Sequence, residues 1–134
     1  PGLPNVSSHI TVRSIVGRFL EHSRILYFNA GGDEKLYLSS ADWMPRNLNN
    51  RVEVLFPIES ESHRKRILAL LELLLSDNQK SHEMKSTGEY RHRRVSGKLK
   101  INAQNELLRQ AKENAVNLAP APWQVQSANP LIEK

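Results

Sequence analysis

The sequence of 134 residues contains no cysteine. This absence excludes a disulfide framework, a thiolate zinc site and a cysteine nucleophile. No apolar run reaches membrane-spanning length, because the longest, around 67–75, is interrupted by Glu72. The sequence has no basic segment followed by an apolar stretch at its start, so no secretion signal is predicted. The chain begins Pro-Gly-Leu-Pro without an initiator methionine, and we therefore expect a segment of a longer polypeptide.

Positive charge is in excess, and the excess lies in one stretch. The formal net charge is +5, and residues 85–100 hold six of the 19 basic residues but one of the 14 acidic residues. The rest of the chain is therefore balanced. Such a local excess of positive charge favours an anionic partner.

Hydrophobic periodicity and turn residues predict one small domain over 1–116. Residues 30–33 and 47–50 read as turns, and 77–88 as a polar loop. The proline-containing tail 117–134 is expected to be disordered. The order of elements predicts an α/β (α+β) fold, with a mixed sheet of three to four strands flanked by helices. The predicted elements are helix 11–22, strands 24–29, 35–40 and 51–56, helix 60–76, a short strand 89–95 and helix 102–116.

Histidines are the first candidates for chemistry. None of the five stands at metal-ligand spacing from a second histidine or a carboxylate, so no metal site is predicted. His63, His82 and His92 lie among polar residues and are interpreted as surface. His22 differs, because it follows a predicted helix and precedes a predicted buried strand. It either binds the last carbonyls of that helix or has a functional role.

A second candidate is the segment from Leu38 to Trp43, where a predicted strand ends. Ser39, Ser40 and Asp42 supply two hydroxyls and a carboxylate at a position where phosphate-binding groups are common. In the alternative interpretation, Ser and Asp side chains bond to the local backbone and Trp43 packs on the core.

Together these segments resemble a phospholipase D half-site, in which His-x-Lys is followed by a strand, a turn and Gly-Ser-x-Asn. Here Arg24 replaces the lysine, Ser39 the glycine and Asp42 the asparagine. These departures agree with a narrower family, since the strings 14–24, 31–44, 46–48 and 51–54 resemble the last catalytic domain of bacterial polyphosphate kinase, type one. The resemblance runs from Pro1 to about Asp77, and more weakly through 86–108.

The resemblance implies a phospholipase D-like half-domain of an enzyme that reversibly transfers the terminal phosphate of ATP to polyphosphate. The phosphohistidine and the Mg²⁺ ligands are expected upstream, so the chain alone should be inactive. His22 matches the second family histidine, with a catalytic and ATP- or phosphate-binding role. Arg24, Ser39 and Ser40 are weaker candidates for binding phosphate. The implied partners are ATP, ADP and polyphosphate rather than nucleic acid, in a cytoplasmic homo-oligomer with or without membrane association.

Two alternatives remain open on the residues themselves. One is a phospholipase D-like phosphodiesterase or nuclease half-site that dimerises. The other is a non-enzymatic polyanion-binding module built on 85–100. If 89–95 is a strand, Arg91 and Arg93 share one face and could form a short track for polyphosphate. A solvated basic edge that discourages aggregation is the competing interpretation.

Overall fold

The computed structural model describes residues 1–93 and 99–117, and confirms the α/β class. Within these residues every strand pair is antiparallel, and the strands form two three-stranded sheets rather than one mixed sheet. The predicted tail, apart from Asn117, lies outside the described residues. The elements are β1 (Arg13–Ile15), β2 (Ile25–Ala30), β3 (Asp33–Ser39), α1 (Pro45–Asn50), β4 (Leu55–Pro57), α2 (Glu61–Ser76), β5 (Ser81–Met84), β6 (Tyr90–His92) and α3 (Ala103–Asn117).

The predicted strands 24–29 and 35–40 are confirmed, with shifts of one or two residues, as β2 and β3, which form a hairpin. Gly31 and Gly32 form its two-residue turn with φ of +67° and +101°. Positive φ at both positions is what a type I′ hairpin turn requires, and glycine adopts it without strain. Pairing runs from Ala30 opposite Asp33 to Ile25 opposite Leu38. The turn therefore sets which residues of the two strands lie side by side.

The region after β3 differs from the prediction. The predicted turn 47–50 belongs to the short helix α1, which has Pro45 in its first turn, where the missing N–H is no loss. The third strand begins at Leu55 rather than at 51, because only residues 55–57 pair with β3. The short α1 thus separates the end of β3 from β4.

The predicted helix 11–22 is wrong. Residues 13–15 form β1, which pairs with β5, and no helix is present between 16 and 24. The apolar residues of this stretch have helical spacing, but pairing with a distant strand overrides that local preference. The same pairing places β5 inside the segment predicted as a polar loop. The predicted strand 89–95 is confirmed over Tyr90–His92, and 94–95 lie outside the described residues.

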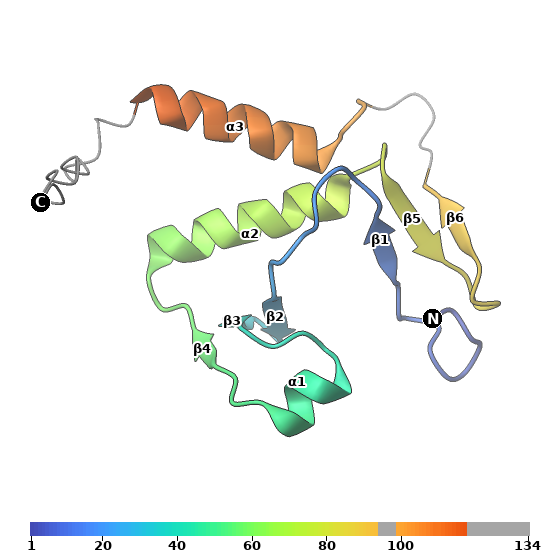
Figure 1. Ribbon diagram of the computed structural model, residues 1–134. Helices are drawn as coiled ribbons and strands as arrows, with labels where there is room; N and C mark the ends of the chain where they lie inside the picture. The colour runs from blue at the N-terminus through green and yellow to red at the C-terminus, as the bar shows by residue number, and fades with distance from the viewer. Residues whose placement is uncertain (94–98, 118–134) are drawn as a thin grey trace, which may run out of the picture.

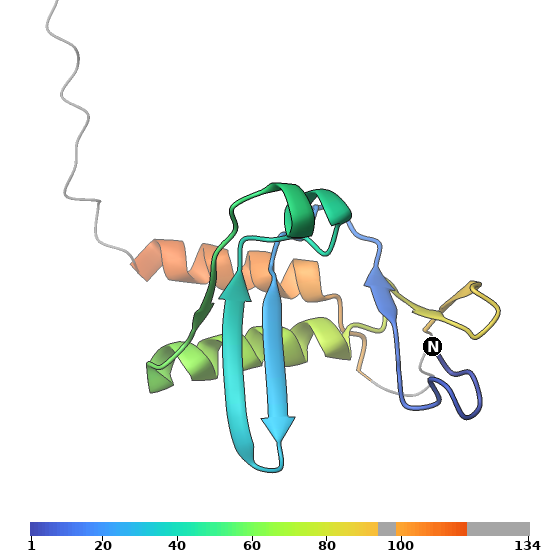
Figure 2. The same cartoon turned by 90° about the horizontal axis from the view of Figure 1, so that it is seen from below.

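The two long helices are confirmed within a residue or two of their predicted bounds. Ser60 is the N-cap residue of α2, although its side chain makes no capping hydrogen bond. Figure 1 shows α2 between α3 and the β2–β3–β4 sheet, and Figure 2 shows the hairpin crossing in front of both helices. A groove between the helices is lined by Ile67, Leu70 and Leu73 of α2 and by Leu107 and Ala111 of α3. No helix within 1–93 and 99–117 is long and apolar enough to cross a membrane.

Much of the buried interior of the described chain is polar. Leu36 and Ala103 are the hydrophobic residues with almost no exposure, at 1% and 0%. Asp77, where α2 ends, is fully buried, and its carboxylate accepts hydrogen bonds from the Lys80 and Ala103 backbone N–H groups at 2.7 and 2.8 Å. This carboxylate joins the end of α2, the approach to β5 and the start of α3. It fixes where α3 begins.

Candidate active site

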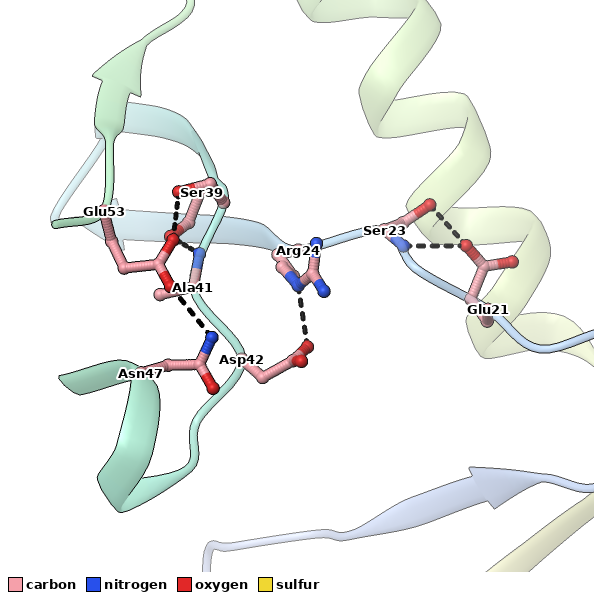
Figure 3. A network of polar contacts seen from close by, with 9 residues as sticks. Glu21, Ser23, Arg24, Ser39, Ala41, Asp42, Asn47 and Glu53 are labelled. Atoms are coloured by element: carbon pink, nitrogen blue, oxygen red, sulfur yellow. Dashed lines mark hydrogen bonds and ion pairs between the residues drawn. The ribbon is translucent and has the colours of Figure 1, made fainter. Parts of the chain in front are cut away.

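His22 lies on the loop between β1 and β2 and is exposed. It does not follow a helix, so the prediction that it binds the last carbonyls of a helix is wrong. The loop is shaped by its own neighbours, since the Ser23 N–H donates to Glu21 Oε1 at 2.9 Å and the Ser23 hydroxyl donates to the same oxygen (Figure 3). The Ser23 hydroxyl is the main cause that lowers the pKa of Glu21. The Glu21–Ser23 turn therefore leaves the His22 side chain facing solvent.

Arg24 forms an ion pair with Asp42. Its Nε–H donates to Asp42 Oδ1 at 2.7 Å, which links the start of β2 to the segment after β3 (Figure 3). This hydrogen bond is the first cause that lowers the pKa of Asp42, and the charges of Arg24, His22 and Arg46 lower it further. The structure thus gathers three potential cations around one carboxylate. Arg24, a weaker candidate for binding phosphate, is thus engaged in an ion pair through its Nε.

The two serines at the end of β3 have different hydrogen bonds. Ser39 Oγ accepts a bond from the Ala41 N–H at 3.0 Å. Ser40 Oγ accepts from the Val54 N–H at 2.9 Å and donates to Glu53. The bond predicted between a serine of this segment and the local backbone is therefore present at Ser39. At Ser40 the partners come instead from the segment leading into β4.

Glu53 joins this network, although no sequence motif marked it as a site residue. Besides the Ser40 hydroxyl it accepts a bond from Asn47 Nδ2 at 2.8 Å, and Asn47 is buried in α1. The Ser40 hydroxyl and then the Asn47 amide lower the pKa of Glu53. The sequence offered one weak signal for Glu53, because its carboxylate alternates with Val52 and Val54 in the predicted strand 51–56. Only the folded chain shows that it faces Ser40.

Trp43 does not pack on the core, because it is 78% exposed. It lines a cavity of about 420 Å³ beside the end of β3, together with Ser39, Leu48, Arg51 and Leu55. The prediction of a core role is wrong because α1 turns the chain away from the sheet immediately after Trp43. An apolar wall and a guanidinium group thus flank the serine segment.

Arg91 and Arg93 belong to the other sheet. Arg91 on β6 pairs with Glu89 at 3.7 Å and both side chains are exposed. Arg93 follows β6, and its Nη1 donates to the Leu75 carbonyl at the end of α2 at 3.1 Å. Figure 1 shows β6 at the edge of its sheet, away from β2 and β3. The structure therefore does not bring these arginines to His22.

His82 and His92 are neighbours, which their separation in sequence did not reveal. They face each other across β5 and β6 with ring centroids 5.0 Å apart in an edge-on arrangement. His82 Nδ1 lies 3.1 Å from the Lys80 carbonyl oxygen, and His92 Nε2 lies 2.9 Å from the Gln79 carbonyl oxygen. Across the described part of the chain, no group of three or more potential metal ligands is found.

Comparison with known proteins identifies the class to which this fold and loop belong. A sequence profile of polyphosphate kinase C-terminal domain 2 matches residues 1–104. The chain therefore belongs to the polyphosphate kinase family, as the resemblance indicated. The profile describes a C-terminal domain of an enzyme, and the chain matches that domain over most of its length.

Individual relatives agree with this assignment. The chain is 59% identical over 109 residues to the polyphosphate kinase of Burkholderia vietnamiensis, covering 81% of this chain and 16% of that protein. It is 51% identical over 114 residues to that of Bacillus anthracis, covering 85% and 16%. The crystal structure of polyphosphate kinase from Porphyromonas gingivalis superposes with a TM-score of 0.77 and 36% identity, covering 88% of this chain and 18% of that one. The chain thus spans less than a fifth of these relatives.

Proposed function

We propose that this chain supplies the His22 part of the active site of a polyphosphate kinase. The whole enzyme would transfer the terminal phosphate of ATP reversibly to polyphosphate, through a phosphohistidine formed in a domain outside this chain. The observation that carries the proposal is the exposed His22 imidazole, next to the Arg24–Asp42 pair, in a chain of this family. ATP, ADP and polyphosphate would be its partners.

The residues around His22 suit phosphoryl transfer, which depends on positioning and charge stabilisation. The imidazole could hold a proton against a phosphate oxygen or exchange one with it. Arg24 gives its Nε–H to Asp42, and the two Nη groups of its guanidinium carry four further N–H donors. A phosphate approaching His22 could accept hydrogen bonds from these groups.

The serines would contribute unequally. The Ser39 oxygen accepts a backbone bond, so its own O–H remains available for a phosphate oxygen. The Ser40 O–H already donates to Glu53, and binding phosphate would require that bond to be exchanged. We therefore propose Ser39 as a phosphate ligand and Ser40 as a residue that holds the strand end in place.

The residues of this chain do not fit a magnesium site near His22. The two nearby carboxylates are already engaged, Glu21 by Ser23 and Asp42 by Arg24. Groups outside this chain would hold Mg²⁺. A homo-oligomeric, cytoplasmic enzyme that does not bind nucleic acid completes the proposal.

A chimeric enzyme tests the proposal. The matching segment of the Burkholderia vietnamiensis kinase is replaced by this chain, and polyphosphate formation from ATP is measured. His22→Ala should lower turnover by roughly 100- to 10,000-fold, because one positioned acid–base group is lost. His63→Ala, at an exposed position on α2, is the matched control, and the 134-residue chain alone should form no polyphosphate. An active chimera that keeps its turnover without His22 would contradict the proposal.

A further inference from the structure

The segment that leads into the His22 loop is bound by one side chain of α3. Gln104, in the first turn of this helix, is 8% exposed. Its Oε1 accepts the Phe19 N–H at 3.0 Å, and its Nε2 donates to the Phe19 carbonyl at 2.7 Å. The amide therefore satisfies both backbone groups of a single residue in a stretch without helix or strand. We call this pair of bonds the Gln104 clamp.

Gly17 makes room for the clamp. A Cβ atom at Gly17 would lie 2.2 Å from Gln104 Oε1 and 2.5 Å from its Cδ, far inside contact distance. The φ angle of Gly17 is not in the left-handed region, so space rather than backbone conformation is what requires glycine here. Gly17 and Gln104 are distant in sequence, but the close approach of their atoms makes them complementary in shape.

The clamp is mounted on a fixed base. Ala103, the residue before Gln104, is fully buried, and its N–H donates to Asp77 Oδ2 at 2.8 Å. Asp77 Oδ1 meanwhile accepts N–H groups on the approach to β5, including that of Ser81 at 3.2 Å. Since α3 cannot shift without breaking these buried bonds, Gln104 holds Phe19 at a defined place relative to α2 and β5.

The His22 loop is consequently tied on both sides. On the near side the clamp fixes Phe19. On the far side the Arg24 carbonyl accepts the Ser39 N–H at 3.0 Å, and the Arg24 side chain pairs with Asp42. Residues 20–23 alone lie between these ties, and the Glu21–Ser23 turn bends them.

We propose that Gln104 is a positioning residue for His22, acting through Phe19, so that α3 is part of the active-site framework. This inference rests on the proposed function of His22. A loop of four residues with fixed ends has few accessible conformations. The imidazole would therefore bind the phosphate with little further loss of conformational entropy. Releasing Phe19 would let the loop move while His22 itself stays intact.

Variants of the chimeric kinase test the proposal. Gln104→Ala removes the clamp, and Gly17→Ala pushes it aside. Each should lower kcat about 10-fold or more, because misplacement of about 1 Å can reduce turnover by about 100-fold. Gln110→Ala, which changes an exposed glutamine of the same helix, should leave kcat unchanged. Gln104→Glu keeps the size and the acceptor and removes the donor to the Phe19 carbonyl, so it reports on the clamp if Gln104→Ala fails to fold.

The double variant separates positioning from unrelated damage. If Gly17→Ala acts by displacing Gln104, it should have little further effect once Gln104 is alanine, so the two losses should not add. Fully additive losses in kcat would overturn the idea that both residues act through one contact. A loss of Tm with unchanged kcat would likewise assign Gln104 a structural role only.

Hydrogen exchange gives a readout that does not depend on activity. Amides in the peptide 17–24 should exchange faster in Gln104→Ala, whereas those in the middle of α2 should not. If exchange rises but kcat does not fall, the clamp exists and its positioning role is refuted. If exchange does not rise, the clamp itself is refuted. If His22→Ala leaves the turnover of the chimeric kinase unchanged, the proposed function is refuted. The exchange data would still test the clamp in that case.

Discussion

At the scale of single residues, His22 owes its setting to bonds that its neighbours make with one another. Glu21 bonds to Ser23, and Arg24 bonds to Asp42, so neither carboxylate is left to occupy the imidazole. Positive groups collect beside Asp42, since the charges of His22, Arg24 and Arg46 all lower its pKa. The Asp42 carboxylate thus reduces the repulsion between several nearby cations. A phosphate chain that approaches would then be attracted by these cations.

The first prediction concerns the Arg24–Asp42 pair. The pKa of Asp42 is lowered in the folded chain, mainly by its hydrogen bond to Arg24. A lowered folded pKa means that the pair stabilises the fold above the unfolded value, about 3.9, and that this contribution is lost as pH falls through the folded pKa. Asp42→Asn should therefore flatten the fall of Tm as pH drops below the unfolded value. Arg24→Met should flatten it in the same way, and a steep fall retained in both variants would contradict the assignment.

At the scale of elements, α3 combines a buried start with an exposed ionic face. Ala103 and Gln104 face the interior, whereas Glu106 accepts bonds from Arg109 Nε at 2.9 Å and from Gln110 Nε2 at 2.9 Å. The Arg109 and then the Gln110 bonds lower the pKa of Glu106 to about 2. A carboxylate in the first turn also suits the positive end of the helix dipole. The helix that carries the Gln104 clamp is therefore stabilised from its solvent side.

The second prediction tests this stabilisation. Glu106→Gln should lower Tm at pH 5 to 7, where the wild-type carboxylate is charged. The difference should shrink as pH falls through about 2, because the wild-type side chain is then neutral as well. Glu61→Gln, which removes one exposed pair with Lys65 on α2, is the matched control and should lower Tm less. A difference between wild type and Glu106→Gln that does not change with pH would show that charge is not the cause.

The elements also show what local sequence can predict and what it cannot. The helices 60–76 and 102–116 and the Gly31-Gly32 hairpin have strong periodicity or turn residues, and each is close to its predicted bounds. The stretch 11–22 has helical spacing as well, but its residues 13–15 pair with β5, whose polar residues carry no strand signal of their own. Pairing between segments so far apart depends on the folded chain, and periodicity cannot report it.

The same limit applies to the candidate site. His22, Ser39 and Ser40 could be named from their places beside predicted strands, and Arg24 from the family resemblance. Gln104 could not, because the residue that it holds, Phe19, is 85 positions away in the chain. A glutamine near the start of a helix looks like an ordinary surface residue, and a glycine at position 17 looks like a weak helix position. Only their close approach gives either a role.

At the scale of the whole molecule, many large hydrophobic residues of the described part of the chain are exposed. No residue of α2 is fully buried, and Val52, Val54, Leu55 and Trp43 are among the large hydrophobic residues that face solvent. A domain that folds alone usually covers such patches. The Burkholderia relative is much longer, since this chain spans 16% of it.

The last prediction concerns the basic edge of the β1–β5–β6 sheet. It separates Arg91 from Arg93, which the sequence placed on the same face of a predicted strand. Arg91 pairs loosely with Glu89 at 3.7 Å, whereas Arg93 binds the Leu75 carbonyl at the end of α2. A polyphosphate chain is a dense linear anion, so each cation that contacts it should release counterions and steepen the salt dependence of binding, as with nucleic acids. In the chimeric kinase, Arg91→Gln should weaken polyphosphate binding and reduce the slope of log Kd against log salt by about 0.7, with Tm unchanged. Arg93→Gln should also lower Tm, because the end of α2 loses a partner. If Arg91→Gln leaves both affinity and slope at their wild-type values, this edge only keeps the sheet soluble, and polyphosphate follows another path across the enzyme.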